Sequence, residues 1–273
     1  MMPSNRRFVA LLGVLLGALA LAGCASKTDT YVERPVETIY NVAMDQLLNG
    51  DYKAAAKSFD DVEQQHPYSV WATKAQLMNA YALYENRDYD ASIVSADRFI
   101  QLHPGHRDVA YAYYLKALDY YIQITDVERD QKVTQQAYDA LSEVVRRFPD
   151  TPYARDAKFK MDLCRDHLAG KEMQIGRWYE SQGQYLAAIN RFQAVVNNYQ
   201  TTTHVPEALH RLVECYYALG LNDEAKRTAS VLGYNYPKSK WYDATYGLVT
   251  TGSETPKEER GWFARVVDPF GLF

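Results

Sequence analysis

"DYKAAAKSFDDVEQQHP", residues 51–67, and "DYDASIVSADRFIQLHP", residues 88–104, are two versions of one phrase. Each version begins with Asp-Tyr, carries a small residue three places after the tyrosine, and ends in His-Pro. A phrase that returns along a chain indicates a structural repeat, in which each copy builds the same unit. The final prolines, Pro67 and Pro104, are the reference points from which further copies can be aligned.

Five copies can be aligned, and they end at Pro67, Pro104, Pro149, Gln200 and Pro237. The residue twelve places before the end is always small: Ala55, Ser92, Ala137, Ala188 and Ala225. The residue five places before it is always apolar: Val62, Phe99, Val144, Val195 and Leu232. Eight places before it stand Phe59, Ala96, Leu141, Phe192 and Ala229. A position near the start of each copy holds Ala43, Ala80, Ala117, Gly176 and Val213, small in all but the last.

The pattern resembles the tetratricopeptide repeat, a pair of antiparallel helices, and the fourth copy, "IGRWYESQGQYLAAINRF" (residues 175–192), matches it best. Two helices can cross closely only where small side chains meet, and larger apolar side chains then fill the space beside the crossing. Proline ends the second helix because it lacks an N–H group. We therefore predict an all-α fold, an α-solenoid of about five helix pairs.

The spacing of the copies predicts the organisation of the chain. We expect repeats one to three within residues 36–150, and a long linking helix with repeats four and five within residues 151–246. The charged stretch "IQITDVERDQKV" (residues 122–133) is predicted as a loop inside the third repeat. The helical pattern from about Ala154 towards Gln182 predicts the linking helix, with Gly170 as its weak point, because glycine is a poor helix former.

The N-terminus has the features of a signal peptide, predicted over residues 1–23. Arg6 and Arg7 precede the apolar run "FVALLGVLLGALALAG", which is shorter than the roughly 20 residues of a transmembrane helix. The segment ends in "LAGC" (residues 21–24), which resembles the bacterial lipobox. That resemblance implies acyl chains on Cys24, a lipidated tether over residues 24–35 and, because residue 25 is alanine, export to the outer membrane at its periplasmic face.

Charge and cysteine content limit the classes of function. Loss of Arg6 and Arg7 with the signal peptide makes the formal charge of −4 still more negative. An acidic chain is a poor partner for nucleic acid, since it has no surplus of cations for the phosphates. Cys164 and Cys215 lie on apolar helical stripes. They are predicted to be buried, and whether they form a disulfide is left open.

No motif in the sequence indicates catalytic activity or a metal-binding site. The histidines of "HPGH" (residues 103–106) include one at a position where other copies have Phe148 or Tyr236, which indicates packing of a ring rather than ligation. Nucleophile elbows, phosphate-binding loops and zinc-type spacings are not found. The sequence therefore predicts a protein that is not an enzyme and that has no cofactor and no metal site.

Tyrosine is abundant, with 23 in the chain. In stacked repeats the first helices line a groove, and their groove positions in repeats one to three predict an aromatic surface for a peptide or partner: Tyr40, Leu77, Tyr81, Tyr84, Tyr111, Tyr114 and Tyr121. In the last two repeats the same positions predict a charged partner face: Arg177, Glu180, His210, Glu214 and Tyr217. The alternative, that several of these tyrosines only pack between repeats, stays open, because aromatic stripes on helices are often core.

A lipobox followed by five such repeats resembles the BamD family (ComL/YfiO) of outer-membrane assembly lipoproteins. The similarity extends over roughly residues 37–242 and includes "HPYSVWATKAQLMNAYALYENRDYDASIVSADRFIQLHPGH" and "FPDTPYARDAKFKMDLCRDHLAGKEMQIGRWYESQGQYLAAINRFQAVVNNY". The resemblance implies a scaffold without enzyme activity, whose partners are the barrel protein BamA, accessory lipoproteins, unfolded barrel substrates and, through the lipid, the membrane. A lipid-anchored adaptor for peptidoglycan or cell-division partners is the alternative.

The C-terminal tail, residues 247–273, is an addition that the resemblance does not explain. Its last stretch, "GWFARVVDPFGLF" (residues 261–273), is apolar and follows a polar linker. An exposed apolar patch tends to find a contact. We therefore expect this stretch to touch a partner or the membrane, with a disordered end as the alternative.

Overall fold

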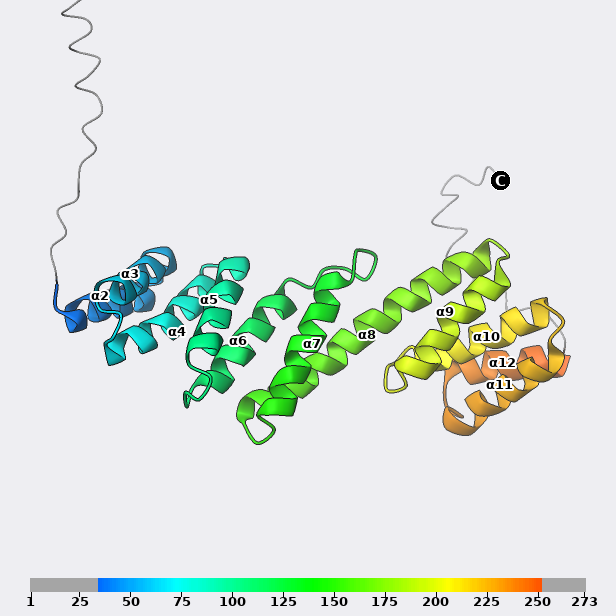
Figure 1. The fold of residues 1–273 in the computed structure, drawn as a ribbon. Coiled ribbons are helices and arrows are strands. Elements are labelled where there is room, and N and C mark those ends of the chain that lie inside the picture. Colours follow the sequence, from blue (N-terminus) through cyan, green and yellow to red (C-terminus); the bar gives the residue numbers. More distant parts are fainter. Residues whose placement is uncertain (1–33, 252–273) are drawn as a thin grey trace, which may run out of the picture. The chain divides into compact units, whose positions relative to one another are not determined.

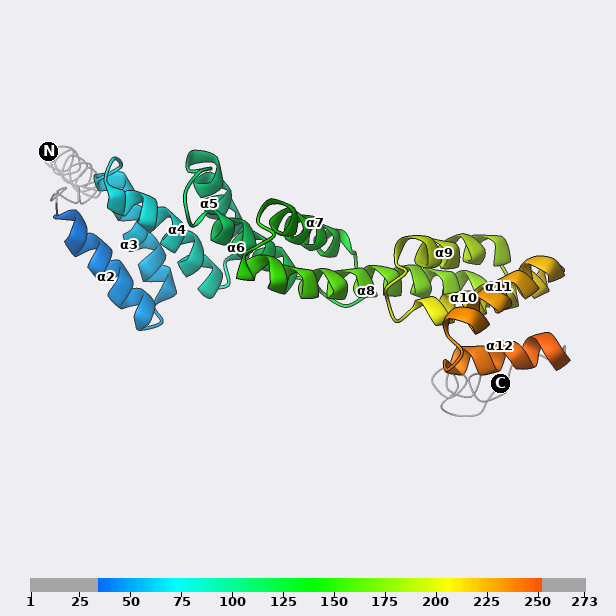
Figure 2. The ribbon, with the colours of Figure 1, turned by 90° about the horizontal axis from the view of Figure 1, so that it is seen from below.

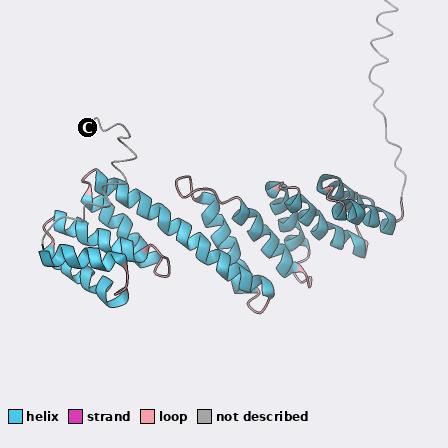
Figure 3. Cartoon of the chain, turned by 180° about the vertical axis from the view of Figure 1, so that it is seen from behind, coloured by secondary structure: helices cyan, strands magenta, loops and turns pink. Residues whose placement is uncertain are grey.

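The computed structural model describes residues 34–251, and its helices belong to one unit that begins at Val36. The described residues form eleven helices and no strand, which confirms the all-α prediction (Figures 1 and 3). The bounds are α2 Val36–Leu48, α3 Tyr52–Gln65, α4 Val70–Glu85, α5 Tyr89–Leu102, α6 Val109–Ile122, α7 Lys132–Arg147, α8 Pro152–Ser181, α9 Tyr185–Asn198, α10 Val205–Ala218, α11 Asn222–Asn235 and α12 Lys240–Thr251. The signal peptide, Cys24, most of the tether and the stretch 261–273 lie outside the described residues.

Each helix packs against the helix that follows it in the chain, from α2 to α11, and α12 packs against both α10 and α11 (Figures 1 and 2). The first helices of the early pairs also touch one another: α2 with α4, α4 with α6, and α6 with α8. This order is that of stacked helix pairs, in which each pair contacts its neighbours. The hydrophobic core is accordingly divided into clusters along the stack.

The small residues of the repeated phrase lie where the two helices of a pair meet. Ala55, Ala137, Ala188 and Ala225 are fully buried, as are the apolar residues seven places after each of them. At the facing position of the fourth repeat even a methyl group does not fit. A Cβ on Gly176 of α8 would lie 2.5 Å from Cε1 of Phe192 in α9. The register predicted from the sequence is therefore the register in which the helices pack.

The end of the phrase builds the turn between one pair and the next. The residue before the end of each copy, which we call the ring residue, is His, Phe or Tyr. Its carbonyl oxygen accepts a hydrogen bond from the N–H group three residues later: Ser69 N to His66 O at 3.0 Å, and Thr151 N to Phe148 O at 3.1 Å. Proline follows the ring residue because its fixed φ suits the second position of such a turn. Gln200 takes that position in the turn from Tyr199 to Thr202, since this kind of turn accepts most residues.

Ser69 and Thr151 also begin the next helix. The Ser69 hydroxyl accepts a hydrogen bond from Ala72 N at 3.0 Å, and that of Thr151 from Ala154 N at 3.2 Å. A side-chain oxygen at this place satisfies one of the N–H groups that the first helical turn leaves without a partner. One short segment thus ends a pair and starts its neighbour, which fixes the stack in a single register.

The long helix expected in the middle of the chain is α8, which is continuous through Gly170. This glycine is buried at a close contact rather than at a weak point: a Cβ there would lie 3.2 Å from Nε2 of His204 and 3.3 Å from Cγ1 of Val127. Lys171 Nζ donates to the carbonyl oxygen of Glu128 at 2.7 Å. The inserted loop between α6 and α7 and the loop between α9 and α10 therefore both pack on α8 at this residue.

The second repeat has a serine, Ser92, at the crossing position where the other repeats have alanine. Its Oγ lies 2.9 Å from the carbonyl oxygen of Ala80 and 2.8 Å from Oδ2 of Asp119, and both Ser92 and Asp119 are fully buried. A hydroxyl carries one proton, so donation to Ala80 requires the proton of the second bond to come from Asp119. Burial raises the pKa of Asp119 to about 7. The hydrogen bond with Ser92 acts to lower this pKa, and the negative charge of Asp90 acts to raise it. The carboxyl group between α4, α5 and α6 is therefore mostly protonated below about pH 7.

Two features of the fold were not determined by the repeat pattern. Cys164 and Cys215 are buried free thiols in different core clusters, so they do not form a disulfide with each other. The helix α12, which the repeat pattern does not include, covers the last pair and begins within the range given to the fifth repeat.

Replacement of Gly176 by alanine tests the crossing in the fourth repeat. Because the new methyl group would overlap the Phe192 ring, Gly176→Ala is expected to lower the free energy of unfolding by about 1–3 kcal/mol. Thermal unfolding followed by circular dichroism measures the change. Gly105→Ala is the matched control, since no atom lies within 4 Å of its added Cβ. Equal melting temperatures for the two variants would contradict the packing described.

The neutral Asp119 gives the stability a pH dependence. Because its pKa is raised in the folded chain, stability that is present below the ordinary pKa of about 4 is lost as pH rises towards about 7. Asp119→Asn keeps the hydrogen bond to Ser92 without a titrating proton. Its stability relative to the parent chain is therefore expected to rise between these pH values and to level off above them, as measured by urea unfolding. The exposed control Asp139→Asn should show no such rise, and a flat difference for Asp119→Asn would refute the neutral carboxyl.

Candidate functional site

The predicted aromatic surface lies on the first helices of repeats one to three, with Tyr40 on α2, three residues on α4 and three on α6. Its tyrosines are all half-buried, whereas Leu77 is buried. Each ring therefore packs against the stack on one side and remains partly open to solvent on the other. Leu77 contributes only by packing.

Four of these tyrosines belong to one group, which we call the tyrosine cluster: Tyr81, Tyr84, Tyr111 and Tyr114. The first three pack against the same buried residues, among them Ala80 and Leu115. Tyr111 and Tyr114 both contact the ring of Tyr153, at centroid distances of 5.6 Å and 5.2 Å. The cluster is therefore made by α4, α6 and the first turn of α8.

The other two tyrosines lie in separate contacts. Tyr40 packs between Phe59 and Trp71, with ring centroids 5.6 Å and 4.7 Å away. Tyr121 lies under the ammonium group of Lys160, which is 5.6 Å from its ring centroid. The structure thus brings together four of the six predicted tyrosines and leaves Tyr40 and Tyr121 outside the cluster.

The hydroxyl groups of the cluster remain protonated at any physiological pH. Burial raises the pKa of Tyr111 well above its usual value, and burial together with the bond to Asp156 does the same for Tyr114. The Tyr114 hydroxyl donates to Asp156, which also accepts from Lys160 Nζ at 2.5 Å. Burial raises the pKa of Asp156, but its hydrogen bonds with Lys160 and Tyr114 together outweigh burial. The pKa of Asp156 is therefore below its usual value. The cluster therefore combines ring faces with groups that donate and accept hydrogen bonds.

Tyr153 belongs to this site and was not predicted. It follows the turn at the end of repeat three, in a phrase that recurs as Pro-x-Ser/Thr-x-aromatic and also gives Trp71 and Trp241. Each of these rings contacts the same groove position of the preceding first helix: Trp71 contacts Tyr40, Tyr153 contacts Tyr114 and Trp241 contacts His210. The recurring phrase is the signal that would have identified all three.

In the last repeats, Arg177, Glu180, His210 and Glu214 form the charged cluster together with Arg211 and Glu207. Arg177 Nη1 lies 2.7 Å from Glu207 Oε1, and Arg211 Nη1 lies 2.8 Å from Glu214 Oε2. Arg211 Nε is 3.8 Å from both Glu180 and Glu207. Three carboxylates are thus arranged around two arginines. Tyr217, also predicted for this face, lies half-buried nearer the end of α10.

Helix α12 covers part of this cluster. His210 is only 2% exposed, its Nδ1 lies 2.8 Å from Oγ1 of Thr245, and its ring packs on Trp241. Burial, with the nearby charge of Arg211, lowers the pKa of His210 to about 4, and burial raises the pKa of Glu180 to about 7 although Arg211 opposes it. His210 is therefore neutral and packed in the core of the predicted face.

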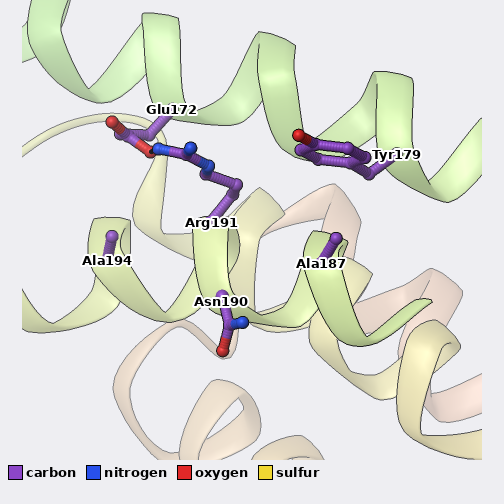
Figure 4. A pocket seen from close by; sticks show the side chains of 6 residues that line it. All are labelled: Glu172, Tyr179, Ala187, Asn190, Arg191 and Ala194. Carbon is purple, nitrogen blue, oxygen red and sulfur yellow. Dashed lines mark hydrogen bonds and ion pairs between the residues drawn. The ribbon is translucent and has the colours of Figure 1, made fainter. Parts of the chain in front are cut away.

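A more accessible surface of the same repeats lies between α8 and α9. It is a hollow of roughly 300 Å³ lined by Glu172, Tyr179, Ala187, Asn190, Arg191 and Ala194 (Figure 4). Arg191 Nη1 lies 3.1 Å from Glu172 Oε2. Trp178 and Leu186 each precede a lining residue in the chain, Tyr179 and Ala187, and both are more than half exposed. This hollow therefore offers charge, ring and apolar contacts that the covered cluster does not.

The histidine of the predicted ring position, His103, is held by a hydrogen bond and by ring packing. His103 Nε2 lies 2.8 Å from Oε1 of Gln76, and its ring packs on Phe99. Across residues 34–251, no group of three or more His, Cys, Asp or Glu side chains has an arrangement that could hold a metal ion. None of the helices described combines the length and apolar character needed to cross a membrane.

Comparison with known proteins gives several curated relatives, all named "Outer membrane protein assembly factor BamD". That of Caulobacter vibrioides is 50% identical over 93% of this chain and 85% of its own length. The relative from Rickettsia prowazekii is 49% identical over 88% of this chain and 96% of its own length. The relative from Neisseria meningitidis serogroup A is 37% identical over 84% of this chain and 91% of its own length. Among solved structures, the tetratricopeptide-repeat domain of P58(IPK) aligns at 14% identity, over 99% of this chain and 66% of its own, with a TM-score of 0.41.

A protein-family model gives the same assignment. The model described as YfiO, outer membrane lipoprotein, matches residues 32–232, a range that holds nearly all of the described helices. The family resemblance noted in the sequence is thereby confirmed. On this match and on relatives 37–50% identical over most of both lengths, the chain belongs to the YfiO family of outer membrane lipoproteins.

Proposed function

We propose that this chain is a scaffold of the machinery that assembles β-barrel proteins into the outer membrane, and that it has no enzymatic activity. The names of its relatives, each an outer membrane protein assembly factor, support the process. The stack of helix pairs supports the role, because such stacks present extended surfaces to other proteins. The observation that carries the proposal is the tyrosine cluster, a half-buried aromatic surface held in place by three helices.

The tyrosine cluster is proposed to receive unfolded barrel substrates. A barrel strand presents alternating apolar or aromatic side chains and, before it is paired, free backbone N–H and C=O groups. The rings of Tyr84 and Tyr114 can pack against such side chains, and tyrosine suits a surface that is only partly dry. Because the pKa of the Tyr111 hydroxyl is raised, that group stays a hydrogen-bond donor for a strand carbonyl.

The last two repeats are proposed to bind the barrel component, BamA, and accessory lipoproteins. The hollow between α8 and α9 is the better candidate surface, since Tyr179 and Arg191 line it and the same two helices expose Trp178 and Leu186 at 56% and 68%. Exposed aromatic and apolar residues next to an arginine are typical of the centre of protein interfaces. The charged cluster under α12 then keeps this end of the stack rigid.

The membrane attachment is proposed to be a lipid on Cys24 at the periplasmic face of the outer membrane. More than one acyl chain is needed for stable anchoring, and a lipidated N-terminal cysteine supplies them. The tether that follows would hold the repeats close to the site where barrel substrates are inserted.

Loss of two rings tests the substrate surface. Tyr84→Ala combined with Tyr114→Ala is expected to weaken the binding of a peptide with an aromatic C-terminus by about tenfold or more, because each buried ring contributes more than 1 kcal/mol at a contact centre. Fluorescence anisotropy measures the affinity and circular dichroism the helix content. Tyr234→Ala, at a tyrosine that is 88% exposed on α11, is the control. The proposal fails if the control weakens binding equally, or if the double variant loses its helices and the rings prove to be purely structural.

Affinity purification of the full chain from detergent-solubilised outer membrane tests the proposed machinery. A barrel protein and small lipoproteins are expected to co-purify, and intact-mass analysis of the same sample is expected to show acyl chains on Cys24. Recovery of peptidoglycan or cell-division proteins without a barrel protein would favour the lipid-anchored adaptor instead. An unmodified Cys24 would overturn the anchor alone.

A further inference from the structure

A second hollow lies in the first two repeats, outside both surfaces described above. It has a volume of roughly 430 Å³, and α3, α4 and α5 each contribute one stripe of residues to it. The α5 residues are Asp90, Ala91, Val94, Ser95 and Arg98, whose spacing of three and four places puts them on one side of the helix. The tyrosine cluster lies on first helices, whereas two of the three walls of this hollow are second helices.

The polar residues in the walls are engaged with one another. Asn79 Nδ2 donates to the carbonyl oxygen of Ala56 at 2.8 Å, and Ser95 Oγ lies 2.8 Å from Oδ1 of Asn79. Asn79 therefore joins α3, α4 and α5 at the hollow. A recess whose walls are fixed in this way needs little reorganisation when it is filled, which favours binding.

Three residues of the lining are apolar. These are Leu83, Ala91 and Val94, and Val94 is 69% exposed. A single exposed valine on a convex surface needs no explanation. Here it stands in a recess with two other apolar residues, so that an apolar side chain of another molecule could displace water from all three.

The charged part of the lining is mostly acidic. It carries Asp60, Glu63 and Asp90 against one cation, Arg98, and Arg98 is paired with Glu63. Asp60 accepts a hydrogen bond from Gln64 at 2.6 Å, but within residues 34–251 no lysine or arginine lies within ion-pair distance of Asp60 or Asp90. Two carboxylates of this hollow therefore have no ion-pair partner among the described residues.

We propose that this hollow is a docking site for a segment of a partner protein in which one aliphatic side chain is flanked by lysine or arginine. The aliphatic side chain would fill the recess against Val94 and Leu83, and the flanking cations would pair with Asp60 and Asp90. Complementary charge of this kind speeds and directs association, and its effect falls with ionic strength. The site is separate from the tyrosine cluster, so a partner and a substrate can be bound at the same time.

Three defined peptides test the chemistry with the purified full chain in detergent. The first has one leucine between pairs of lysines, the second has serine in place of the leucine, and the third has glutamates in place of the lysines. The first is expected to bind most tightly, by fluorescence anisotropy at low salt, and to weaken as salt is added. Asp60→Lys combined with Asp90→Lys should reduce its affinity about tenfold or more, since two attractions become repulsions. Asp223→Lys, at an exposed acid on α11, should not.

Crosslinking in the intact membrane tests the partner. A photoreactive benzoylphenylalanine replaces Val94 or, as the control, Val231, which is exposed on α11. A segment that joins only to position 94 and carries an aliphatic residue between basic ones would support the proposal. Equal binding of the three peptides, no binding of any, an unaffected Asp60→Lys/Asp90→Lys variant, or identical crosslinks from both positions would overturn it. Crosslinks from position 94 to the chain's own tether, to a second copy or to lipid would also overturn it. None of these results bears on the function proposed for the tyrosine cluster.

Discussion

The close crossing of two helices at small side chains is the contact on which the rest of this structure depends. At the fourth repeat the distance is set by Gly176, whose missing Cβ leaves room for the Phe192 ring. Alanines and one serine have the same part in the other pairs. Because the helices of a pair lie this close, the large apolar residues on either side of the crossing are buried, and each pair forms a unit that can stack.

Stacking determines what the surfaces can do. The turn that ends a pair, such as His66 to Ser69, also begins the next first helix. The aromatic residue two places after the turn, here Trp71, contacts the preceding first helix. At α8 this residue is Tyr153, which completes the tyrosine cluster. At α12 it is Trp241, which covers His210 and so converts part of a charged face into core. One local device thus builds an open aromatic surface at one repeat and a closed charged cluster at another.

The repeat register was predictable because it rests on local and periodic signals: small residues at the crossings, apolar residues beside them, and a proline at the end of four of the five copies. The environment of single side chains was not. Helix α12 lies outside the five aligned copies, and no second helix follows it within residues 34–251, so the period does not predict it. Without α12, His210 would be expected to be a surface residue. Tyr153 stands where α8 begins, outside the alignment of first helices. Gly170 reads as a helix breaker, because the loops that pack against it are distant in the sequence.

Charge shows the same division between what a sequence reveals and what only packing decides. Ser92 is visible as a small residue, but its bond to Asp119, and therefore the proton on that buried carboxyl, depends on three helices meeting. Asp60 and Asp90 are ordinary surface acids in the sequence, and they come to line one partly apolar hollow only when α3 and α5 both pack on α4. The spacing of residues in the sequence therefore predicts the helix stack. The packing of that stack determines which polar groups are available to partners.

Hydrogen–deuterium exchange of the full chain, with and without a peptide from the C-terminal strand of a barrel substrate, tests the central claim most directly. If the tyrosine cluster receives substrate, amide exchange should slow in α4, in α6 and in the first turns of α8, where Tyr153 lies. Exchange in α10 and α11 should not change. Slower exchange confined to the last two repeats, or no change in α4 and α6, would contradict the account.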